Sequence, residues 1–285
     1  MKLCIYDYGR LGVVRDGAIF DATAALEHLP AWRYGVRDGD PLIEALPDLR
    51  SKIEVAAARS APVALSDVAL KAPVVWPGKL VGAPVNYNDH LAEAQADPSV
   101  FTAAQVTRIH EIGLFLKATS SLVGCSEGIT VGKADRRTDH EVELAVIIGR
   151  TASKVGREKA LDYVAGYAIG LDITVRGPEE RSMRKSIDSY SVLGPWMVTA
   201  DEIDDPGNLD FSLKVNGEVR QSANTRDLVI DVPGLIEMAS SWYTLQPGDV
   251  IYTGTPAGVG PIAPGDLITA TVQKIGTMEV AVRGG

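Results

Sequence analysis

Apolar and polar residues alternate in short runs along most of the chain, which is the pattern of β-strands, and a helical period is confined to a few segments. Residues 1–70 carry short apolar runs separated by turn signals such as Arg15-Asp16-Gly17, with an alanine-rich helical stretch from about Pro41 to Ala58. Two prolines and a glycine in residues 72–79 are typical of the entry to a new domain. The sequence therefore predicts a small N-terminal domain over residues 1–72 and a larger domain over residues 73–285.

The larger domain is predicted to consist mainly of strands and turns. A short strand is expected at Leu80–Gly82, and Asn88 or Asp89 can cap a helix that follows it. Asn216-Gly217 is a strong hairpin signal. Further helices are expected at residues 102–112, 157–161 and 232–240.

One strand of this domain carries two glutamates in an otherwise apolar run, residues 138–150. Side chains alternate between the faces of a strand, so Glu141 and Glu143 share one face while Val142 and Leu144 point to the other. Two carboxylates whose Cα atoms are roughly 7 Å apart repel each other unless a positive charge lies between them. This segment alone fits a divalent-cation site and an edge strand with a solvated acidic face about equally.

A second acid in similar surroundings favours the cation site. The apolar run 163–174 ends on one carboxylate, Asp172. Carboxylates from the ends of two strands, with water in the remaining positions, form a typical open site for Mg²⁺, Mn²⁺ or Ca²⁺. Glu141, Glu143 and Asp172 are therefore the predicted metal ligands.

Composition narrows the class of protein. The chain has 285 residues, 46% hydrophobic residues and a formal net charge of −9, with no basic block, so a nucleic-acid partner is not expected. A small anionic substrate remains compatible with a local basic cluster. The two cysteines lack the spacing of a disulfide scaffold or a zinc site, and no apolar run reaches the length of a membrane span. A cytoplasmic location is predicted.

Three further features are candidates for chemistry. His90 and Glu93 lie three residues apart on a predicted helix, where they form either a water-activating pair or a plain surface pair. Residues 176–189 are dense in charge and should mostly form a solvated loop, from which Lys185 could reach a pocket and stabilise an enolate. Arg176, at the start of this stretch, is a candidate substrate-binding residue.

A glycine-rich loop at residues 253–260 follows an apolar strand. It lacks the Gly-Lys-Ser/Thr ending and the helix of a phosphate-binding loop, which disfavours a nucleotide site. Its backbone N–H groups and the Thr255 hydroxyl could bind a substrate carboxylate, and an ordinary wide turn explains the sequence equally well.

Taken in order, these segments closely resemble the fumarylacetoacetate hydrolase family from about residue 80 to the C-terminus. The resemblance rests on eight ordered motifs: Asn86-Tyr87-x-Asp89-His90-x-x-Glu93, Phe115-Leu116-Lys117-x-x-Ser120-Ser121, Asp139-x-Glu141-x-Glu143-Leu144, Asp172-x-Thr174-x-Arg176, Lys185-Ser186-x-Asp188, Gly194-Pro195-Trp196, Asn216-Gly217 and Thr253-Gly254-Thr255-Pro256-x-Gly258-Val259-Gly260.

The resemblance implies an α+β fold, a mixed β-roll or sandwich with outer helices, usually found as a homodimer that acts on 2-oxo or β-diketo acids bound to Mg²⁺ or Mn²⁺. The metal ligands it implies are the same three carboxylates. It assigns water activation to His90 and Glu93 and enolate stabilisation to Lys185. Lys117 and Thr255 match positions that line the oxalyl end of the substrate.

Departures from the family pattern concern the substrate. Many relatives have Asp-x-Gln after the arginine, where this chain has Gly177, Pro178 and Glu179, so a carboxylate replaces an amide that can donate. Ala118 and Leu171 replace a common proline and asparagine. These changes leave the metal ligands and His90–Glu93 in place but leave the distal group of the substrate open.

The predicted function is a divalent-metal-dependent hydrolase that cleaves the C–C bond of acylpyruvate-type β-diketo acids in the catabolism of aromatic or related compounds. The main alternative is a decarboxylase or isomerase of an unsaturated 2-oxo dicarboxylic acid, oxaloacetate decarboxylation included. A non-catalytic 2-oxo acid binding protein is the alternative from another class. A binder would not need a water-activating pair, which argues against it.

Overall fold

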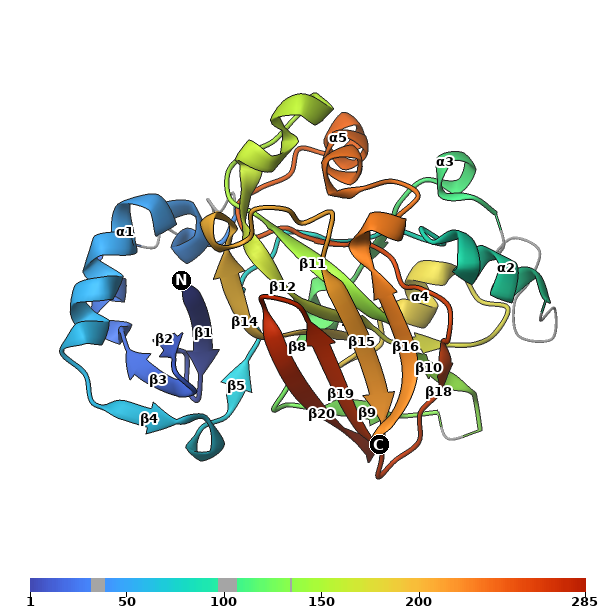
Figure 1. The fold of residues 1–285 in the computed structure, drawn as a ribbon, viewed down its shortest axis with the longest axis horizontal. Coiled ribbons are helices and arrows are strands. Elements are labelled where there is room, and N and C mark those ends of the chain that lie inside the picture. Colours follow the sequence, from blue (N-terminus) through green and yellow to red (C-terminus); the bar gives the residue numbers. More distant parts are fainter. Residues whose placement is uncertain (32–38, 97–106, 134) are drawn as a thin grey trace.

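The computed structural model describes residues 1–31, 39–96, 107–133 and 135–285. Strands dominate it, and five α-helices lie around them in the described part of the chain (Figure 1). The helices are α1 Pro41–Ala58, α2 Asn88–Ala96, α3 Ile109–Ile112, α4 Arg181–Lys185 and α5 Val232–Trp242. Among these residues, no helix is long and apolar enough to cross a membrane.

The largest sheet crosses the whole molecule. Its order is β4-β3-β2-β1-β14-β12-β11-β17-β6-β7, with β5 paired to β1 and β8 to β14. Its strands are β1 Lys2–Tyr6, β2 Arg10–Arg15, β3 Ala18–Asp21, β4 Pro62–Ala64, β5 Leu70–Lys71, β6 Leu80–Gly82, β7 Phe115–Lys117, β8 Leu122–Val123, β11 Val142–Ile148, β12 Val164–Asp172, β14 Ser191–Thr199 and β17 Val250–Tyr252.

Two smaller sheets complete the architecture. A five-stranded sheet lies in front of the large sheet in Figure 1 and has the order β16-β15-β19-β20-β9. A three-stranded sheet has the order β13-β10-β18. Their strands are β9 Ile129–Val131, β10 Thr138–His140, β13 Thr174–Val175, β15 Asp210–Val215, β16 Glu218–Asn224, β18 Gly260–Pro261, β19 Leu267–Val272 and β20 Gly276–Gly284.

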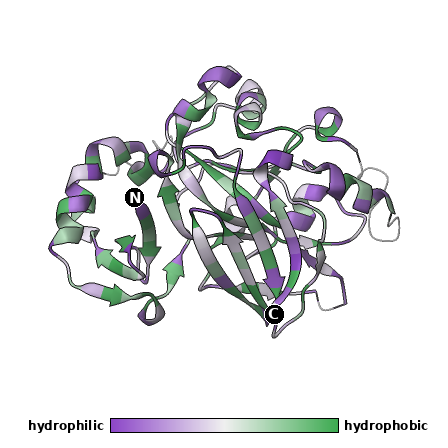
Figure 2. Ribbon diagram, viewed as in Figure 1, coloured by the Kyte–Doolittle hydropathy of each residue, from purple (hydrophilic) through white to green (hydrophobic). Residues whose placement is uncertain are grey.

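The two faces of the central strands are buried in two separate apolar clusters. On β11, Val142 and Leu144 belong to the cluster shared with the five-stranded sheet, whereas Ala145 and Ile147 belong to the cluster that α1 covers. Burial on both faces explains the near-continuous apolar sequence of β11. The outer strands instead alternate in hydropathy, as the five-stranded sheet in Figure 2 does.

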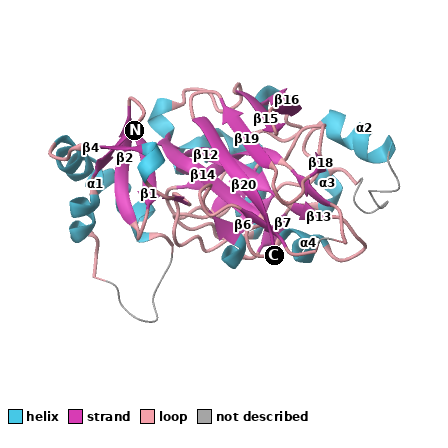
Figure 3. Ribbon diagram, turned by 90° about the horizontal axis from the view of Figure 1, so that it is seen from below, coloured by secondary structure: helices cyan, strands magenta, loops and turns pink. Residues whose placement is uncertain are grey.

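Helix α1 matches its predicted bounds because its ends are defined locally. Asp40 caps it by accepting from the N–H groups of Leu42 and Ile43 at 2.9 and 3.2 Å, and Pro41 occupies the first turn. Buried Leu46 and Ile53 turn toward the strands of the N-terminal region. Seen from below in Figure 3, α1 forms the outer layer at one end of the molecule.

Strand β1 pairs in antiparallel fashion with β14, with Leu3 opposite Met197. The predicted N-terminal domain thus contributes strands to the same sheet as the rest of the chain, and its boundary at residue 72 stays a prediction. The predicted strand at Leu80–Gly82 is present, and the predicted hairpin is formed by β15 and β16.

The remaining helix predictions have mixed outcomes. The expected segment 157–161 is a short 3₁₀ helix, Arg157–Tyr163, and the expected segment 232–240 is α5. The predicted helix 102–112 lies in part outside the described residues, and α3 is its described portion. The predicted α+β class is confirmed.

Candidate active site

Three carboxylates meet where β11 and β12 lie side by side. The register places Glu143 opposite Gly170, and the N–H of Asp172 donates to the carbonyl of Glu141 at 2.9 Å. One oxygen from each of Glu141, Glu143 and Asp172 lies within 4.8 Å of the others, and all three residues are buried. These oxygens form a hard donor set of the kind that Mg²⁺ and Mn²⁺ prefer.

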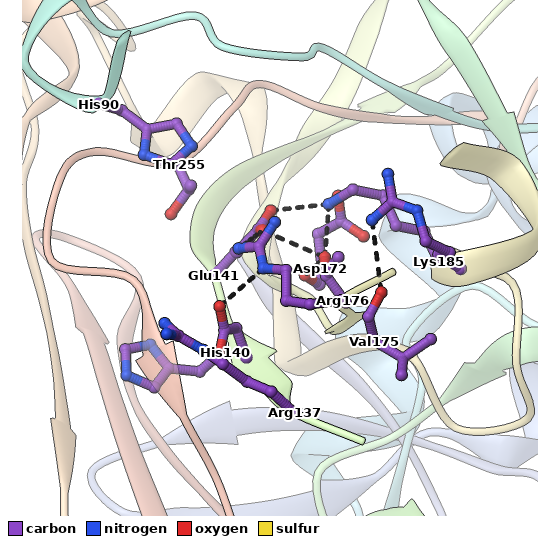
Figure 4. A network of polar contacts seen from close by, with 12 residues as sticks. His90, Arg137, His140, Glu141, Asp172, Val175, Arg176, Lys185 and Thr255 are labelled. Atoms are coloured by element: carbon purple, nitrogen blue, oxygen red, sulfur yellow. Dashed lines mark hydrogen bonds and ion pairs between the residues drawn. The ribbon is translucent and has the colours of Figure 1, made fainter. Parts of the chain in front are cut away.

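Cationic side chains surround this carboxylate triad (Figure 4). Lys185 on α4 places Nζ 2.7 Å from both Glu141 Oε2 and Asp172 Oδ2. Arg176 donates to Glu141 Oε1 at 3.0 Å. Lys117, at the end of β7, donates to Asp172 Oδ1 and to the carbonyl of Tyr190. Glu141 and Asp172 are therefore paired with cations although they are buried.

Glu141 and Glu143 differ in pKa because, among the described residues, the cations pair with Glu141 and not with Glu143. Burial, with repulsion from Asp172 and Glu141, raises the pKa of Glu143 well above its ordinary value. Burial acts the same way on Glu141, but the charges of Lys185 and Arg176 outweigh it and lower the pKa of that carboxyl. Glu143 is thus the member of the triad that most needs a further positive charge.

His90 and Glu93 form the predicted pair on α2. Their Nδ1 and Oε2 atoms are 3.1 Å apart, and Glu93 Oε1 accepts from the N–H of Gly258 at 3.0 Å. Burial raises the pKa of Glu93, but the hydrogen bonds from His90 and Gly258 dominate and lower it overall. A carboxylate on Nδ1 leaves Nε2 as the basic nitrogen of the imidazole.

These groups share one pocket. A cavity of about 40 Å³ is lined by His90, by the carboxylate triad and by Arg176, Lys185 and Thr255, together with Ala83, Pro84, Val85, Phe115, Arg181 and Arg184. The base and the carboxylates thus face one space, in which His90 approaches from α2 and the acids approach from the sheet.

The three predicted substrate-binding residues take different places. Arg176 lines the pocket, while Lys117 is fully buried behind Asp172 and is not part of the pocket wall. Thr255 lines the pocket, but its hydroxyl donates to the carbonyl of Val142 at 2.9 Å and accepts from Gln221 at 2.8 Å. Its hydroxyl group is therefore committed to protein contacts.

The glycine-rich loop binds carboxylates of the protein itself. The N–H of Gly254 donates to Glu143 Oε2 at 2.6 Å, and Gly258 holds Glu93. Gly254 has φ +99°, and a Cβ there would lie 2.7 Å from the Cβ of Asn86, so a side chain is excluded on both counts. The loop orients one predicted metal ligand and the partner of His90.

The prediction of a mostly solvated loop for residues 176–189 is wrong. Residues 181–185 form α4, and Arg184 and Lys185 are buried. Arg184 donates to the carbonyls of Glu179 and Val175 at 2.9 and 3.3 Å. Sequence charge suggested exposure, but carbonyl and carboxylate partners from other segments make burial favourable here.

The negative charge of Glu179, which stands where many relatives have an amide, is compensated by a nearby arginine. Arg136 donates to both of its carboxylate oxygens at 3.0 and 2.8 Å, and this bidentate pair lowers the pKa of Glu179 to about 2. The carboxylate that replaces an amide in the family pattern is therefore neutralised by an arginine. His140 is buried, with Nδ1 3.1 Å from Gln221 Oε1.

Gln221 was not singled out from the sequence, although it supports several site segments. Its Oε1 accepts from the N–H of Val142, between the two glutamates, and its Nε2 donates to Thr255 Oγ1 and the carbonyl of Pro256. Asn86, noted only as part of a motif, links Thr253 to Ile230 by hydrogen bonds of 2.8 Å. These contacts span strands and loops far apart in sequence, so no local signal marks them.

The sheet architecture with a buried carboxylate triad beside a histidine–glutamate pair defines a class of metal-dependent hydrolases. The fumarylacetoacetate (FAA) hydrolase C-terminal family model matches residues 79–283. The chain belongs to this family.

Relatives and solved structures agree with this assignment. A maleylpyruvate hydrolase of Aquipseudomonas alcaligenes is 55% identical over 285 residues, which cover 99% of each chain. The crystal structure of maleylpyruvate hydrolase from Sphingobium sp. SYK-6 in complex with manganese(II) ion and pyruvate has a TM-score of 0.85 at 42% identity and covers 100% of both chains.

Isomerases occur among the structural neighbours as well. The 2-hydroxyhepta-2,4-diene-1,7-dioate isomerase from Mycobacterium marinum has a TM-score of 0.73 at 28% identity and covers 100% of this chain and 98% of its own. Because the nearer neighbours described above are hydrolases, the prediction of a metal-dependent C–C bond hydrolase is confirmed. The non-catalytic alternative is excluded with it.

Proposed function

We propose that this protein hydrolyses maleylpyruvate, or an acylpyruvate of the same type, to pyruvate and the corresponding acid. The observation that carries the proposal is the convergence of His90 and the carboxylate triad on one pocket. The names of the two hydrolases compared above support the choice of substrate.

Glu141, Glu143 and Asp172 would hold one Mg²⁺ or Mn²⁺ ion, which supplies Lewis acidity toward the carboxylate and keto oxygens of a 2-oxo acid. The fit rests on three buried oxygen donors within 4.8 Å of one another and on the raised pKa of Glu143, which a cation would relieve.

His90 acts as the general base in this proposal. Glu93 accepts a hydrogen bond from Nδ1–H, so Nε2 is the nitrogen that would take a proton from a water molecule as the oxygen of that water attacks the acyl carbonyl carbon. The N–H of Gly258 holds Glu93 in turn, so the carboxylate that orients the imidazole ring of His90 is itself held in place. The protonated His90 can later return this proton to the product, so no further acid is needed.

The C–C bond between the attacked carbon and the methylene of the pyruvyl group then breaks. Its electron pair forms the enolate of pyruvate, and the proton that His90 took from water passes to that carbon to complete the product. Lys185 Nζ, 2.7 Å from two carboxylate oxygens of the triad, places a positive charge beside the developing enolate. One water is consumed, and one pyruvate and one carboxylic acid are formed.

Product analysis tests this function. Purified protein treated with chelator should not consume maleylpyruvate, and addition of Mn²⁺ or Mg²⁺ should restore equal amounts of pyruvate and maleate. Oxaloacetate serves as the comparison substrate, because its decarboxylation needs an enolate but no activated water. Metal-dependent release of carbon dioxide without hydrolysis of maleylpyruvate would favour the decarboxylase instead.

We further propose that the protein forms a homodimer and that it is located in a reducing compartment. Large apolar side chains at the surface, such as Trp242 at 78% and Met183 at 67% exposure, are of the kind that subunit contacts cover. Both cysteines are free and buried. Light scattering on the purified protein measures the subunit number directly.

A further inference from the structure

Four basic side chains line the pocket: Arg176, Arg181, Arg184 and Lys185. Three of them are engaged by oxygen atoms of the protein. Arg176 and Lys185 bind carboxylates, and Arg184 donates to two backbone carbonyls. Arg181 differs from them. Among the described residues, no carboxylate or carbonyl lies within hydrogen-bonding distance of its guanidinium group.

Arg181 instead lies over an aromatic ring. Its Cζ is 5.7 Å from the ring centroid of Phe115, and Lys185 Nζ is 5.5 Å from the same centroid. Gly82 makes room for this ring, because a Cβ at that position would lie 2.2 Å from Cζ of Phe115. Arg181 and Lys185 are four residues apart on α4, so they are neighbours on one helix face about 5–6 Å apart at Cβ.

The charge balance of the pocket favours a second anionic group. Lys117, Lys185 and Arg176 already pair with the carboxylates of the cluster. A divalent cation adds two positive charges, and a 2-oxo carboxylate brings one negative charge. Arg181 adds another partly desolvated positive charge, since burial lowers its pKa. Glu141, Asp172 and Glu180 attract this charge from beyond hydrogen-bonding distance, so a monoanionic substrate would leave the guanidinium without a directly bound anion.

Resting on the proposed function, we infer that Arg181 binds the distal carboxylate of a dicarboxylic acylpyruvate and selects such substrates over monocarboxylic ones. The 2-oxo acid end lies at the carboxylate triad beside Lys185. The carbon chain crosses the ring of Phe115, and its far carboxylate meets the guanidinium fork one helical turn away. A planar guanidinium matches a carboxylate by two parallel hydrogen bonds, which lysine cannot make.

The test compares two substrates with the holoenzyme in Mn²⁺. R181Q should lower kcat/KM for maleylpyruvate by about 10- to 100-fold, the usual effect of a lost charge-assisted hydrogen bond, mainly through KM. Its kcat/KM for acetylpyruvate, which lacks a distal carboxylate, should change by less than about 3-fold. R181K should fall between R181Q and wild type. R50Q is the matched control, because Arg50 pairs with Asp201 at the surface of the N-terminal region.

The possible results distinguish a failure of the role proposed for Arg181 from a failure of the proposed function. Wild-type protein that hydrolyses neither substrate would overturn the proposed function. Wild-type protein that hydrolyses both, with R181Q affecting both equally or neither, would overturn the role of Arg181 alone. Inhibition of wild-type acetylpyruvate hydrolysis provides a readout that needs no variant. Maleate should inhibit at least 10-fold more strongly than crotonate, and equal inhibition would contradict the inference.

Discussion

In the described part of the chain, two groups of buried carboxylates differ in their partners. Asp40 and Asp249, near the junction of α1 with the body of the sheet, are bound by backbone N–H groups. Asp40 accepts from four of them at 2.9–3.2 Å, and Asp249 accepts from the N–H groups of Lys79 and Gln246 at 2.7 and 2.9 Å as well as from Lys79 Nζ at 3.0 Å. The oxygens of both acids are thus occupied by separate donors of the protein.

The carboxylate triad has the opposite arrangement. Its oxygens converge within 4.8 Å, and most of their partners are side-chain cations. Backbone donors hold a carboxylate in place for structure, whereas convergent oxygens raise the pKa of a neighbour and create a binding position for a cation. Burial of an acid alone therefore does not identify a metal site, whereas the convergence of several carboxylate oxygens does.

The strongest separation of the two groups is expected from Glu143→Ala. Loss of one oxygen donor from the triad should abolish Mn²⁺ binding and reduce turnover of maleylpyruvate to background. Calorimetric titration with Mn²⁺ and a pyruvate-release assay measure both effects. Full metal-dependent activity in this variant would mean that the ligands are wrongly assigned.

His90→Ala removes the base and leaves the triad intact. Hydrolysis of maleylpyruvate should fall by about 10²-fold or more, while any oxaloacetate decarboxylation and the Mn²⁺ affinity remain close to wild type. His28→Ala, which changes an exposed histidine in the N-terminal region, is the control. If His90→Ala leaves hydrolysis unchanged, then His90 is not the base and its contact with Glu93 serves structure alone.

Asp40→Ala probes the other group of acids. The variant loses the N-cap of α1 and leaves the N–H groups of Val75 and Trp76 without this acceptor, so unfolding free energy should drop by about 2 kcal/mol. Denaturant titration should give this loss both with and without Mn²⁺. A loss that appears only in the metal-loaded protein would contradict a purely structural role.

Glu143→Gln gives the smallest and most specific effect. Because the pKa of Glu143 is raised in the folded, metal-free protein, the folded state binds the proton of this carboxyl more tightly than the unfolded state does. Proton binding therefore stabilises the folded state fully at pH values below the pKa of Glu143 in the unfolded chain. This stabilisation is lost as the pH rises through the pKa of Glu143 in the folded protein. Glutamine mimics the protonated state, so the metal-free variant should be more stable than wild type at neutral pH and above.

Thermal unfolding across pH measures this gain, which should shrink toward pH 4. Addition of Mn²⁺ should reverse the order, because only wild type gains binding energy from the cation. Equal stability of both proteins at every pH would show that Glu143 is not strained by its neighbours.

Local signals explain which parts were predictable from the sequence. The period of two in β11 placed Glu141 and Glu143 on one face, and the spacing of His90 and Glu93 on a helix placed them in contact. The cap and proline at the start of α1 fixed its first residue. Each of these features depends on residues that are close in sequence.

Long-range pairing explains what was missed. The burial of Arg184 depends on the carbonyl of Val175 and that of Glu179 around α4, and the role of Gln221 depends on strand β16 reaching β11. The sharing of one sheet by β1 and β14 joins residues almost two hundred positions apart. Periodicity carries no information about such partners.

An anomalous difference map from crystals grown with Mn²⁺ shows directly whether the carboxylate triad is the metal site. We expect one strong peak among Glu141, Glu143 and Asp172, at about 2.0–2.2 Å from an oxygen of each, and none beside Asp40 or Asp249. A crystal of Glu143→Ala grown in the same way should lack that peak. Manganese bound elsewhere, with no peak at the carboxylate triad, would show that the triad is not the metal site.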